Sequence, residues 1–154
     1  MKILVTGTSG FIGTHLCHEL EKVGHQVTGI DKINGDLLDP FIITYWLDRT
    51  QPDVCVHLAA KVGREFGEDD LKVTVLDNAG MTAIVARACG ERDVQLVYAS
   101  TSEIYGDLGN GTAHEDTIPQ LPHNLYGLSK RWGEEVAELY APVGQRLSDS
   151  LCLM

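Results

Sequence analysis

A strand–loop–helix signature near the N-terminus constrains the fold more than any other feature of this sequence. Residues 6–13 read TGTSGFIG, directly after an apolar run and just before an amphipathic helical pattern. Gly7 permits a tight turn, Gly10 lets backbone approach a phosphate, and Gly13 lets a helix pack closely on a strand. Because a helix N-terminus attracts anions, the segment predicts a loop that binds the pyrophosphate of a dinucleotide. A glycine turn with a purely structural role is the alternative.

An acidic residue at the end of the next apolar run supports the dinucleotide interpretation. Asp31 lies 18 residues beyond Gly13, directly after the run at 27–30. A carboxylate in this position accepts hydrogen bonds from the ribose hydroxyls of adenosine and repels a 2′-phosphate. We therefore expect NAD, and not NADP, as the cofactor.

Short apolar runs alternate with helical patterns along the rest of the chain. The expected strands cover residues 3–5, 27–30, 54–58 and 94–99. The expected helices cover residues 12–23, 40–47, 71–89 and 124–140. The last of these helices carries an apolar stripe at Leu125, Leu128, Trp132, Val136 and Leu139. Such alternation predicts an α/β fold, a doubly wound parallel sheet of the Rossmann type with helices on both faces.

The length of the chain, 154 residues, fits one domain. We assign residues 1–141 to an NAD-binding domain and residues 142–154 to an irregular tail. After the last helix a further apolar strand is expected, but no turn or cap signal marks a finished edge there. The sequence therefore looks truncated at its C-terminus. The stretch from Asp31 to Asp36 is also so short that the usual third strand is expected to be minimal or absent.

Charge and cysteine content exclude several classes of function. The net charge of −10 argues against binding nucleic acid or anionic membranes through bulk electrostatics. No CxxC pair occurs among the four cysteines, so we expect no metal site, and reduced, buried thiols at Cys17, Cys55 and Cys89. Neither a signal peptide nor a run long enough to span a bilayer is visible. These features predict a cytoplasmic protein.

Tyr126 and Lys130 form a YxxxK pair on the last expected helix. Residues four apart share a helix face, so the ammonium lies near the phenol. A neighbouring cation lowers the pKa of a tyrosine from about 10 toward neutrality. Tyr126 is then a candidate general base or acid at a sugar hydroxyl. The alternative is a surface tyrosine beside a solvated lysine.

A polar segment comes after the strand at 94–99, at the carboxyl end where open α/β sheets place their active sites. Here Thr101 is a candidate hydrogen-bond donor to a reacting oxygen, and Glu103 is a candidate second acid or base. For Ser100 and Ser102 we favour a role in satisfying backbone groups of the loop.

Taken in order, these motifs resemble the extended short-chain dehydrogenases/reductases, and more narrowly the NAD-dependent nucleotide-sugar epimerase/dehydratase family. The resemblance spans about residues 1–140. It rests on the glycine loop, Asp31, the Gly-Asp-Leu at 35–37, the His-Leu-Ala-Ala at 57–60, the Ser-Thr-Ser-Glu-Ile-Tyr-Gly at 100–106 and the Tyr-Gly-Leu-Ser-Lys at 126–130.

The resemblance implies a role for each matching residue. Thr101, Glu103, Tyr126 and Lys130 are the implied catalytic residues. The implied cofactor-binding residues are Gly7, Gly10, Phe11, Ile12, Gly13, Asp31, Asp36, Leu37, Ala59, Ala60, Asn78, Tyr126 and Lys130. Asn78 opens the family's Asn-x-x-Gly-Thr helix pattern, in which Met81 here replaces the glycine.

The resemblance also implies a reaction, in which a sugar carbon of a nucleotide-sugar gives hydride to NAD while Tyr126 takes the hydroxyl proton. Thr-Ser-Glu looks most like the dehydratase and decarboxylase branches, whereas Lys-Val-Gly at 61–63 is reminiscent of the GDP-fucose synthase branch. Epimerisation, dehydration, decarboxylation and reduction therefore stay open. Because the family's substrate domain has no counterpart in this sequence, a truncated NAD-binding module with weak or no activity is the alternative function.

Association into a homodimer is a further implication, because family members often pair the helices around Asn78 and Tyr126 into a four-helix interface. An exposed sheet edge is the other route to self-association that the short strand content suggests.

Overall fold

The fold is built on a five-stranded parallel sheet. The glycine loop comes directly after the strand that is second in the order across this sheet. The computed structural model describes residues 1–61, 70, 72–114, 121–140 and 151–153. The strand order is β2-β1-β3-β4-β5, with every neighbouring pair parallel. The strands are β1 (Lys2–Thr6), β2 (Gln26–Ile30), β3 (Val54–His57), β4 (Gln95–Thr101) and β5 (Leu151–Leu153). This arrangement is the Rossmann-type doubly wound sheet that the sequence predicts.

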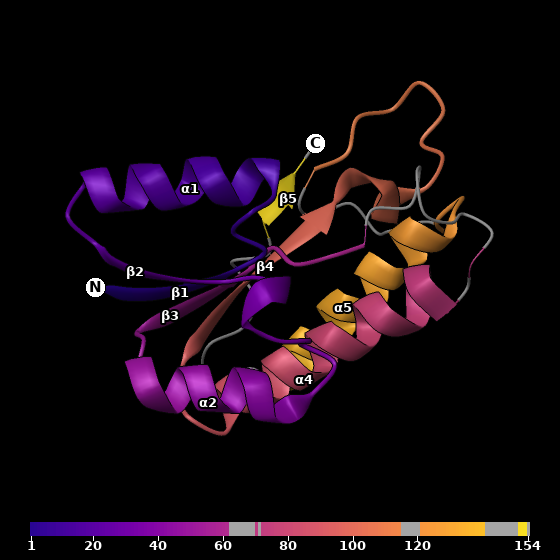
Figure 1. Cartoon of the computed structure of the whole chain (residues 1–154). Helices are drawn as coiled ribbons and strands as arrows, with labels where there is room; N and C mark the ends of the chain where they lie inside the picture. Colours follow the sequence, from indigo (N-terminus) through magenta and orange to yellow (C-terminus); the bar gives the residue numbers. More distant parts are fainter. Residues whose placement is uncertain (62–69, 71, 115–120, 141–150, 154) are drawn as a thin grey trace.

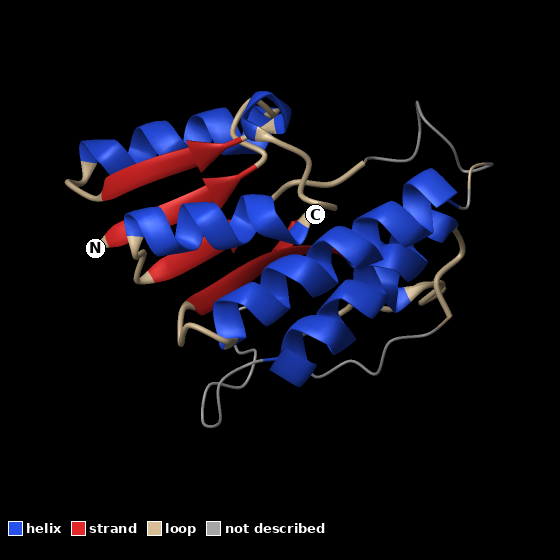
Figure 2. Cartoon of the chain, turned by 60° about the horizontal axis from the view of Figure 1, so that its bottom comes forward, coloured by secondary structure: helices blue, strands red, loops and turns tan. Residues whose placement is uncertain are grey.

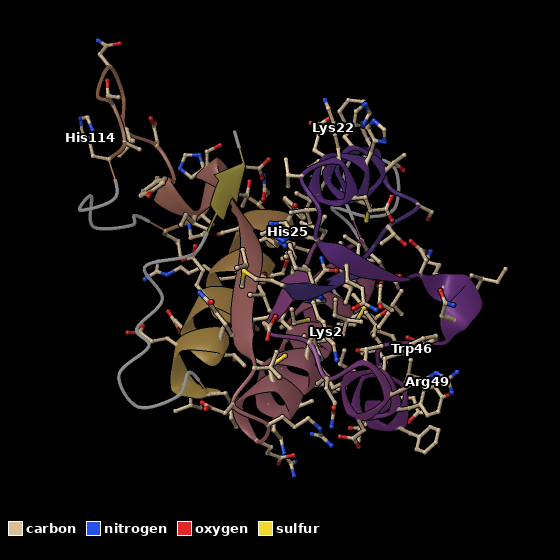
Figure 3. All side chains as sticks on the ribbon, turned by 90° about the vertical axis from the view of Figure 1, so that its left-hand side faces the viewer. Lys2, Lys22, His25, Trp46, Arg49 and His114 are labelled. Carbon is tan, nitrogen blue, oxygen red and sulfur yellow. The ribbon has the colours of Figure 1, made fainter. Side chains whose placement is uncertain are left out.

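Helices lie on both faces of the sheet. They are α1 (Phe11–Lys22), α2 (Pro40–Thr50), α4 (Asn78–Gly90) and α5 (Leu125–Tyr140). Helix α1 covers one face, beside β1 and β2, while α2, α4 and α5 cover the other (Figures 1 and 2). Figure 3 looks from the side and shows Lys22 of α1 and Arg49 of α2 on opposite sides of Lys2 in β1.

The main core lies between the sheet and the helices α2 and α4. Strand β1 is buried on both faces, with Leu4 and Val5 fully inaccessible, as its continuous apolar sequence predicts. The core cluster consists of Leu4, Ile30, Leu37, Ile43, Leu47, Cys55, Met81, Val85, Ala88, Cys89 and Val94. The thiols of Cys55 and Cys89 are buried and free, as expected, whereas Cys17 is half-buried.

Local capping signals explain where α2 begins. Asp39 is its N-cap, and the Asp39 carboxylate accepts a hydrogen bond of 3.0 Å from the backbone nitrogen of Phe41. Pro40 occupies the first helical position, where its missing N–H removes no helical bond.

Between β2 and α2 only a 3₁₀ turn, η1 (Lys32–Asn34), is present, so the expected loss of the third strand is confirmed. Strand β2 is therefore an edge strand.

Two segments differ from the sequence prediction. The helix expected over 71–89 starts as a π-helical turn, η2 (Lys72–Asp77), and continues as α4 to Gly90, while residue 71 lies outside the described residues. The irregular tail expected over 142–154 contains strand β5, which pairs with Ala99 to Thr101 at the end of β4. Residues 142–150 and 154 lie outside the described part of the chain.

The apolar stripe of α5 is not its buried face. The buried positions are instead Gly127, Ser129, Lys130, Gly133 and Ala137, while Trp132 and Leu139 are exposed. The reason lies in the neighbouring strand, because a Cβ atom at Gly133 would collide with the hydroxyl of Tyr98 in β4. Small residues therefore let α5 approach the sheet closely, and Trp132 and Leu139 face outward, while Leu125, Leu128 and Val136 are half-buried.

Candidate functional site

The glycine loop has a backbone geometry that only small residues allow. Gly7 has a φ of +76°, and its nitrogen donates a hydrogen bond of 2.8 Å to the carbonyl of Ile30. A Cβ atom at Gly7 would lie 2.8 Å from the nitrogen of Ala59, and one at Gly13 would collide with the carbonyl oxygen of Gly7. Gly10 is the N-cap of α1 and offers no side-chain acceptor. The N–H groups of the first turn therefore face the loop without a capping side chain, as in anion sites at helix N-termini.

Asp31 joins the end of β2 to this loop. Its Oδ2 accepts a hydrogen bond of 2.7 Å from the backbone nitrogen of Ser9, and its Oδ1 accepts one of 2.7 Å from that of Lys32. Burial opposes ionisation of the carboxyl, but the bonds from Ser9 and Lys32 outweigh it and lower the pKa of Asp31. A carboxylate is therefore held at the loop, where further lone pairs can accept from hydroxyls.

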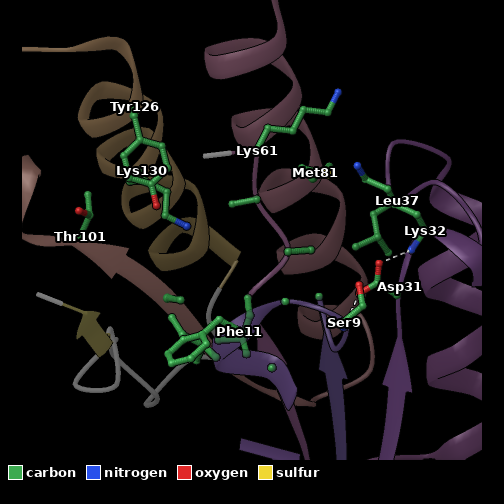
Figure 4. A pocket seen from close by; sticks show the side chains of 18 of the residues that line it. Ser9, Phe11, Asp31, Lys32, Leu37, Lys61, Met81, Thr101, Tyr126 and Lys130 are labelled. Carbon is green, nitrogen blue, oxygen red and sulfur yellow. Dashed lines mark hydrogen bonds between the residues drawn. The ribbon is translucent and has the colours of Figure 1, made fainter. Parts of the chain in front are cut away.

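A pocket with a volume of about 880 Å³ runs along the carboxyl ends of β1, β2, β3 and β4. Every predicted site residue except Glu103 and Asn78 lines it. Figure 4 shows Thr101, Tyr126 and Lys130 at one end of the pocket and Asp31, Lys32 and Leu37 at the other. The elongated site thus has a carboxylate end, a glycine-loop middle and a tyrosine–lysine end.

The pocket also contains residues that the sequence interpretation missed. They are Ser9, Lys32, Gly35, Leu58, Lys61, Met81, Ala99 and Ser100. Most of them are sequence neighbours of predicted residues, so widening each motif by one or two positions would have found them. Met81 is different, because its place at the pocket depends on how α4 packs, which no local pattern reveals.

Asn78 does not line the pocket, but it forms hydrogen bonds with a residue that does. Its Oδ1 accepts a hydrogen bond of 2.7 Å from the nitrogen of Lys61, and its Nδ2 donates to the carbonyl of Lys61 at 2.9 Å and to Ser129 Oγ at 3.4 Å. Asp77 also pairs with the ammonium of Lys61. The Asn78 amide therefore links the loop after β3 to α4 and α5, and its direct contact with a cofactor stays a prediction.

Lys130 is nearly inaccessible, with 3% of its surface exposed, yet its side chain reaches the pocket. Burial disfavours the ammonium and lowers the pKa of Lys130 to about 8, although the carboxylate of Glu134 partly offsets this. Burial therefore weakens the preference of Lys130 for its ammonium form.

The expected lowering of the pKa of Tyr126 is not found in this structure. Burial of the phenol, together with a smaller repulsion from the carboxylate of Glu103, raises the pKa of Tyr126. The prediction considered only the attraction of Lys130 and neglected the cost of burying a phenolate beside an acid.

Thr101 and Glu103 lie at the turn η3 (Ser102–Tyr105) that comes after β4. Thr101 Oγ1 accepts a hydrogen bond of 3.4 Å from the nitrogen of Glu103 and lines the pocket. Glu103 Oε2 accepts a hydrogen bond of 2.5 Å from Asn124 Nδ2, and Asn124 Oδ1 accepts one of 2.7 Å from the nitrogen of Gly127. Glu103 is therefore tied to the start of α5, beside Tyr126 and outside the pocket lining.

Among the described residues, no group of three or more histidine, cysteine, aspartate or glutamate side chains is arranged to hold a metal ion. No helix within the same residues is long and apolar enough to cross a membrane.

Comparison with known proteins gives matches along almost the whole chain. The model of the NAD dependent epimerase/dehydratase family matches residues 3–146. The spore coat polysaccharide biosynthesis protein SpsK of Bacillus subtilis is 33% identical over 141 residues, which cover 90% of this chain and 48% of SpsK. An uncharacterized UDP-glucose epimerase, YtcB, of the same organism is 34% identical over 165 residues, which cover 91% of this chain and 52% of YtcB.

A solved structure agrees with these matches. The UDP-glucose 4-epimerase of Thermus thermophilus in complex with NAD superposes with a TM-score of 0.82 at 29% identity, over 91% of this chain and 50% of the epimerase. The chain thus spans about half the length of each of these three proteins.

Proposed function

The chain belongs to the NAD-dependent epimerase/dehydratase family, and we propose that it binds NAD and oxidises a hydroxyl carbon of a nucleotide-sugar. The observation that carries this proposal is the arrangement of one continuous pocket. The glycine loop and Asp31 share that pocket with Thr101, Tyr126 and Lys130.

The two ends of the pocket suit the two ends of a dinucleotide. Asp31, Asp36 and Leu37 would hold the adenosine, and the first turn of α1 behind Gly10 would hold the pyrophosphate. Lys130, at the other end, would donate to the ribose of the nicotinamide. When bound, NAD supplies the acceptor for the hydride that leaves the sugar carbon.

The residues of the tyrosine–lysine end would handle the proton. The phenolate of Tyr126 accepts the proton of the sugar hydroxyl, and the Thr101 hydroxyl donates a hydrogen bond to the same oxygen. The Lys130 ammonium stabilises the phenolate, which burial and Glu103 otherwise disfavour. Glu103 serves as a second acid or base for steps after the oxidation.

The fate of the keto-sugar depends on the branch of the family. Glu103 favours dehydration or decarboxylation, whereas the Lys-Val-Gly at 61–63 favours a reductase like the GDP-fucose synthases. Of these three residues, Val62 and Gly63 lie outside the described part of the chain. Epimerisation needs only return of the hydride to the other face of the carbon. We keep these outcomes as alternatives that product analysis distinguishes.

A second candidate function is an NAD-binding module with weak or no turnover. It is favoured by the raised pKa of Tyr126, because burial and Glu103 disfavour the phenolate that the reaction needs.

We also place the protein in the cytoplasm, with a nucleotide-sugar as partner and no nucleic acid or membrane. The buried free thiols of Cys55 and Cys89 suit a reducing compartment, and the net charge of −10 disfavours polyanions.

The first experiment is thermal unfolding of the purified chain with NAD and, in parallel, with NADP. A ligand that binds only the folded state stabilises it by RT ln(1 + [L]/Kd), about 2.7 kcal/mol at a hundredfold excess over Kd. We expect a rise in melting temperature with NAD that NADP does not match. If neither cofactor shifts the transition, both candidate functions are wrong.

The second experiment separates the two candidates. The chain with NAD is incubated with a panel of nucleotide-sugars. Reduced cofactor is monitored by absorbance, and sugar products are separated by chromatography, which resolves epimers of equal mass, and identified by mass spectrometry. Turnover that Tyr126→Phe abolishes, and that Tyr45→Phe on the exposed side of α2 retains, supports the enzyme. Binding of NAD without any product supports the module.

A further inference from the structure

A buried aromatic ring lies against the ammonium of Lys130. Tyr98 in β4 is 1% exposed, and Lys130 Nζ lies 4.4 Å from the centroid of its ring. The Tyr98 hydroxyl donates to the backbone carbonyl of Lys130 at 3.5 Å. A cation within about 6 Å of an aromatic centroid is attracted by the negative face of the ring, most strongly where water is excluded.

A second ring supports the first from inside the sheet. His57 in β3 is buried and stacks on Tyr98, with ring centroids 6.0 Å apart and planes inclined by 26°. His57 Nδ1 and Thr6 Oγ1 lie 2.7 Å apart. The ring of Tyr98 is thus in contact with both His57 and the ammonium of Lys130.

The rings of His57 and Tyr98 are both uncharged near neutral pH. Burial, aided by the charge of Lys130, lowers the pKa of His57 to about 3. Burial likewise raises the pKa of Tyr98 far above its ordinary value. The attraction between Tyr98 and Lys130 is therefore that of a ring face for a cation, and not an ion pair.

Two nearby groups favour the ammonium of Lys130, namely the carboxylate of Glu134 and the ring face of Tyr98. On α5, Glu134 favours the ammonium and Tyr126 is a neutral phenol, while His57 on β3 is neutral. In the described part of the chain, no carboxylate forms an ion pair with Lys130. A paired carboxylate would cancel the field that Lys130 exerts, whereas a ring face offsets burial and leaves the full positive charge.

We propose that Tyr98 is a positioning residue whose ring face keeps the buried Lys130 side chain protonated at the tyrosine–lysine end of the pocket. The role of Lys130 toward Tyr126 and the cofactor rests on the proposed function, but the interaction of Tyr98 with Lys130 does not. The alternative is that Tyr98 only fills space against Gly133, in which case any ring of the same shape serves equally.

The test measures the protonation of Lys130 directly. Protein with ¹³C at lysine Cε is titrated by NMR without cofactor, and Lys130→Arg identifies the resonance. We expect Tyr98→Phe to keep the midpoint close to that of the unchanged protein, and Tyr98→Leu to lower it by about one pH unit.

A graded series of fluorinated rings at position 98 tests the proposal even if the leucine variant does not fold. Phenylalanine at position 98 is replaced by phenylalanines with one, two and five ring fluorines, which retain nearly the same shape but weaken the negative ring face stepwise. The midpoint of Lys130 should fall in the same order, while circular dichroism and melting temperature stay those of Tyr98→Phe. An unchanged midpoint across the series overturns the proposal.

The two proposals fail separately. A graded midpoint in a protein that neither binds NAD nor turns over a nucleotide-sugar supports the Tyr98 interaction and contradicts the proposed function. Binding and turnover together with a constant midpoint of Lys130 support the proposed function and contradict the Tyr98 interaction.

Discussion

At the scale of single residues, Asp31 combines two tasks that a test must separate. Its carboxylate accepts from Ser9 and Lys32, which shapes the glycine loop, and we propose that it also accepts from a ribose. Asp31→Asn keeps one acceptor oxygen but presents an amide donor to one of these N–H groups. A hydrogen bond to a charged group contributes about 1.5–3 kcal/mol, so we expect the Kd for NAD to rise roughly ten- to a hundredfold.

The same substitution should raise the relative affinity for NADP, because the charge that repels the 2′-phosphate is gone. Isothermal titration with both cofactors measures this ratio. Asp107→Asn removes an equal charge from an exposed turn outside the pocket and is the matched control. An Asp31→Asn protein with the unchanged preference for NAD would show that another group discriminates between the cofactors.

His57 makes stability depend on pH in a direction set by its burial. Its pKa is about 3 in the folded chain and about 6.5 in the unfolded chain, so the unfolded state binds the extra proton between these values. The free energy of unfolding should therefore fall as the pH falls through this window, by up to about 1.4 kcal/mol per pH unit.

Urea unfolding between pH 7 and pH 4, in unchanged protein and in His57→Gln, measures this contribution as a difference in slope. His18→Gln on the exposed side of α1 serves as the control and should retain the slope of the unchanged protein. Equal slopes in His57→Gln and in the unchanged protein would mean that His57 is not buried in its neutral form.

At the scale of elements, the turn between β1 and α1 depends on close approach as well as on backbone angle. Gly7 and Gly24 both have positive φ, +76° and +89°, but only a Cβ at Gly7 meets neighbouring backbone, that of Ala59. Gly24→Ala should cost about 1 kcal/mol of stability through strain alone. Gly7→Ala should cost several times more, because β1 and β3 must separate, and it should abolish the shift with NAD.

Chemical denaturation and cofactor-induced thermal shifts of the two variants provide the comparison. Should Gly7→Ala be no less stable than Gly24→Ala, the contact with Ala59 would not limit the size of residue 7.

The elements that the sequence predicts well are those with local signals. Continuous apolar runs mark the strands, and the Asp39–Pro40 cap marks the start of α2, so their observed bounds differ little from prediction. The buried face of α5 was missed because it depends on the ring of Tyr98, which comes from a distant strand. The π-helical turn before α4 has no pattern of its own.

The residues of the site also divide into those that a local sequence signal marks and those that only the packing of separate elements brings together. Local motifs predicted the glycine loop, Asp31 and the Tyr126–Lys130 pair at the pocket. The attachment of Asn78 to Lys61 and the ring beneath Lys130 join residues from separate elements. The raised pKa of Tyr126 likewise reflects burial and Glu103, which spacing along a helix does not reveal.

At the scale of the whole molecule, the outward stripe of α5 and the edge of β2 are two places where a second copy can dock. Trp132 and Leu139 lie seven residues apart, on one face of α5, and are 42% and 75% exposed. Large exposed apolar residues that share one surface can mark a site of interaction with another protein. We therefore favour a homodimer through α5 over pairing at the β2 edge.

This preference leads to a prediction for Trp132→Glu. Placing a carboxylate in the centre of an apolar interface leaves a buried charge without a partner, so the dimer should dissociate while the monomer keeps its fold. Sedimentation velocity over a range of concentrations gives the oligomeric state, and circular dichroism reports the fold. Phe41→Glu, which removes an aromatic residue 67% exposed on α2, is the matched control and should leave the dimer intact. Dimers that persist in Trp132→Glu would show that the α5 stripe is not the interface and would favour the unpaired edge of β2. Unchanged protein that is monomeric at every concentration would contradict both routes to a dimer.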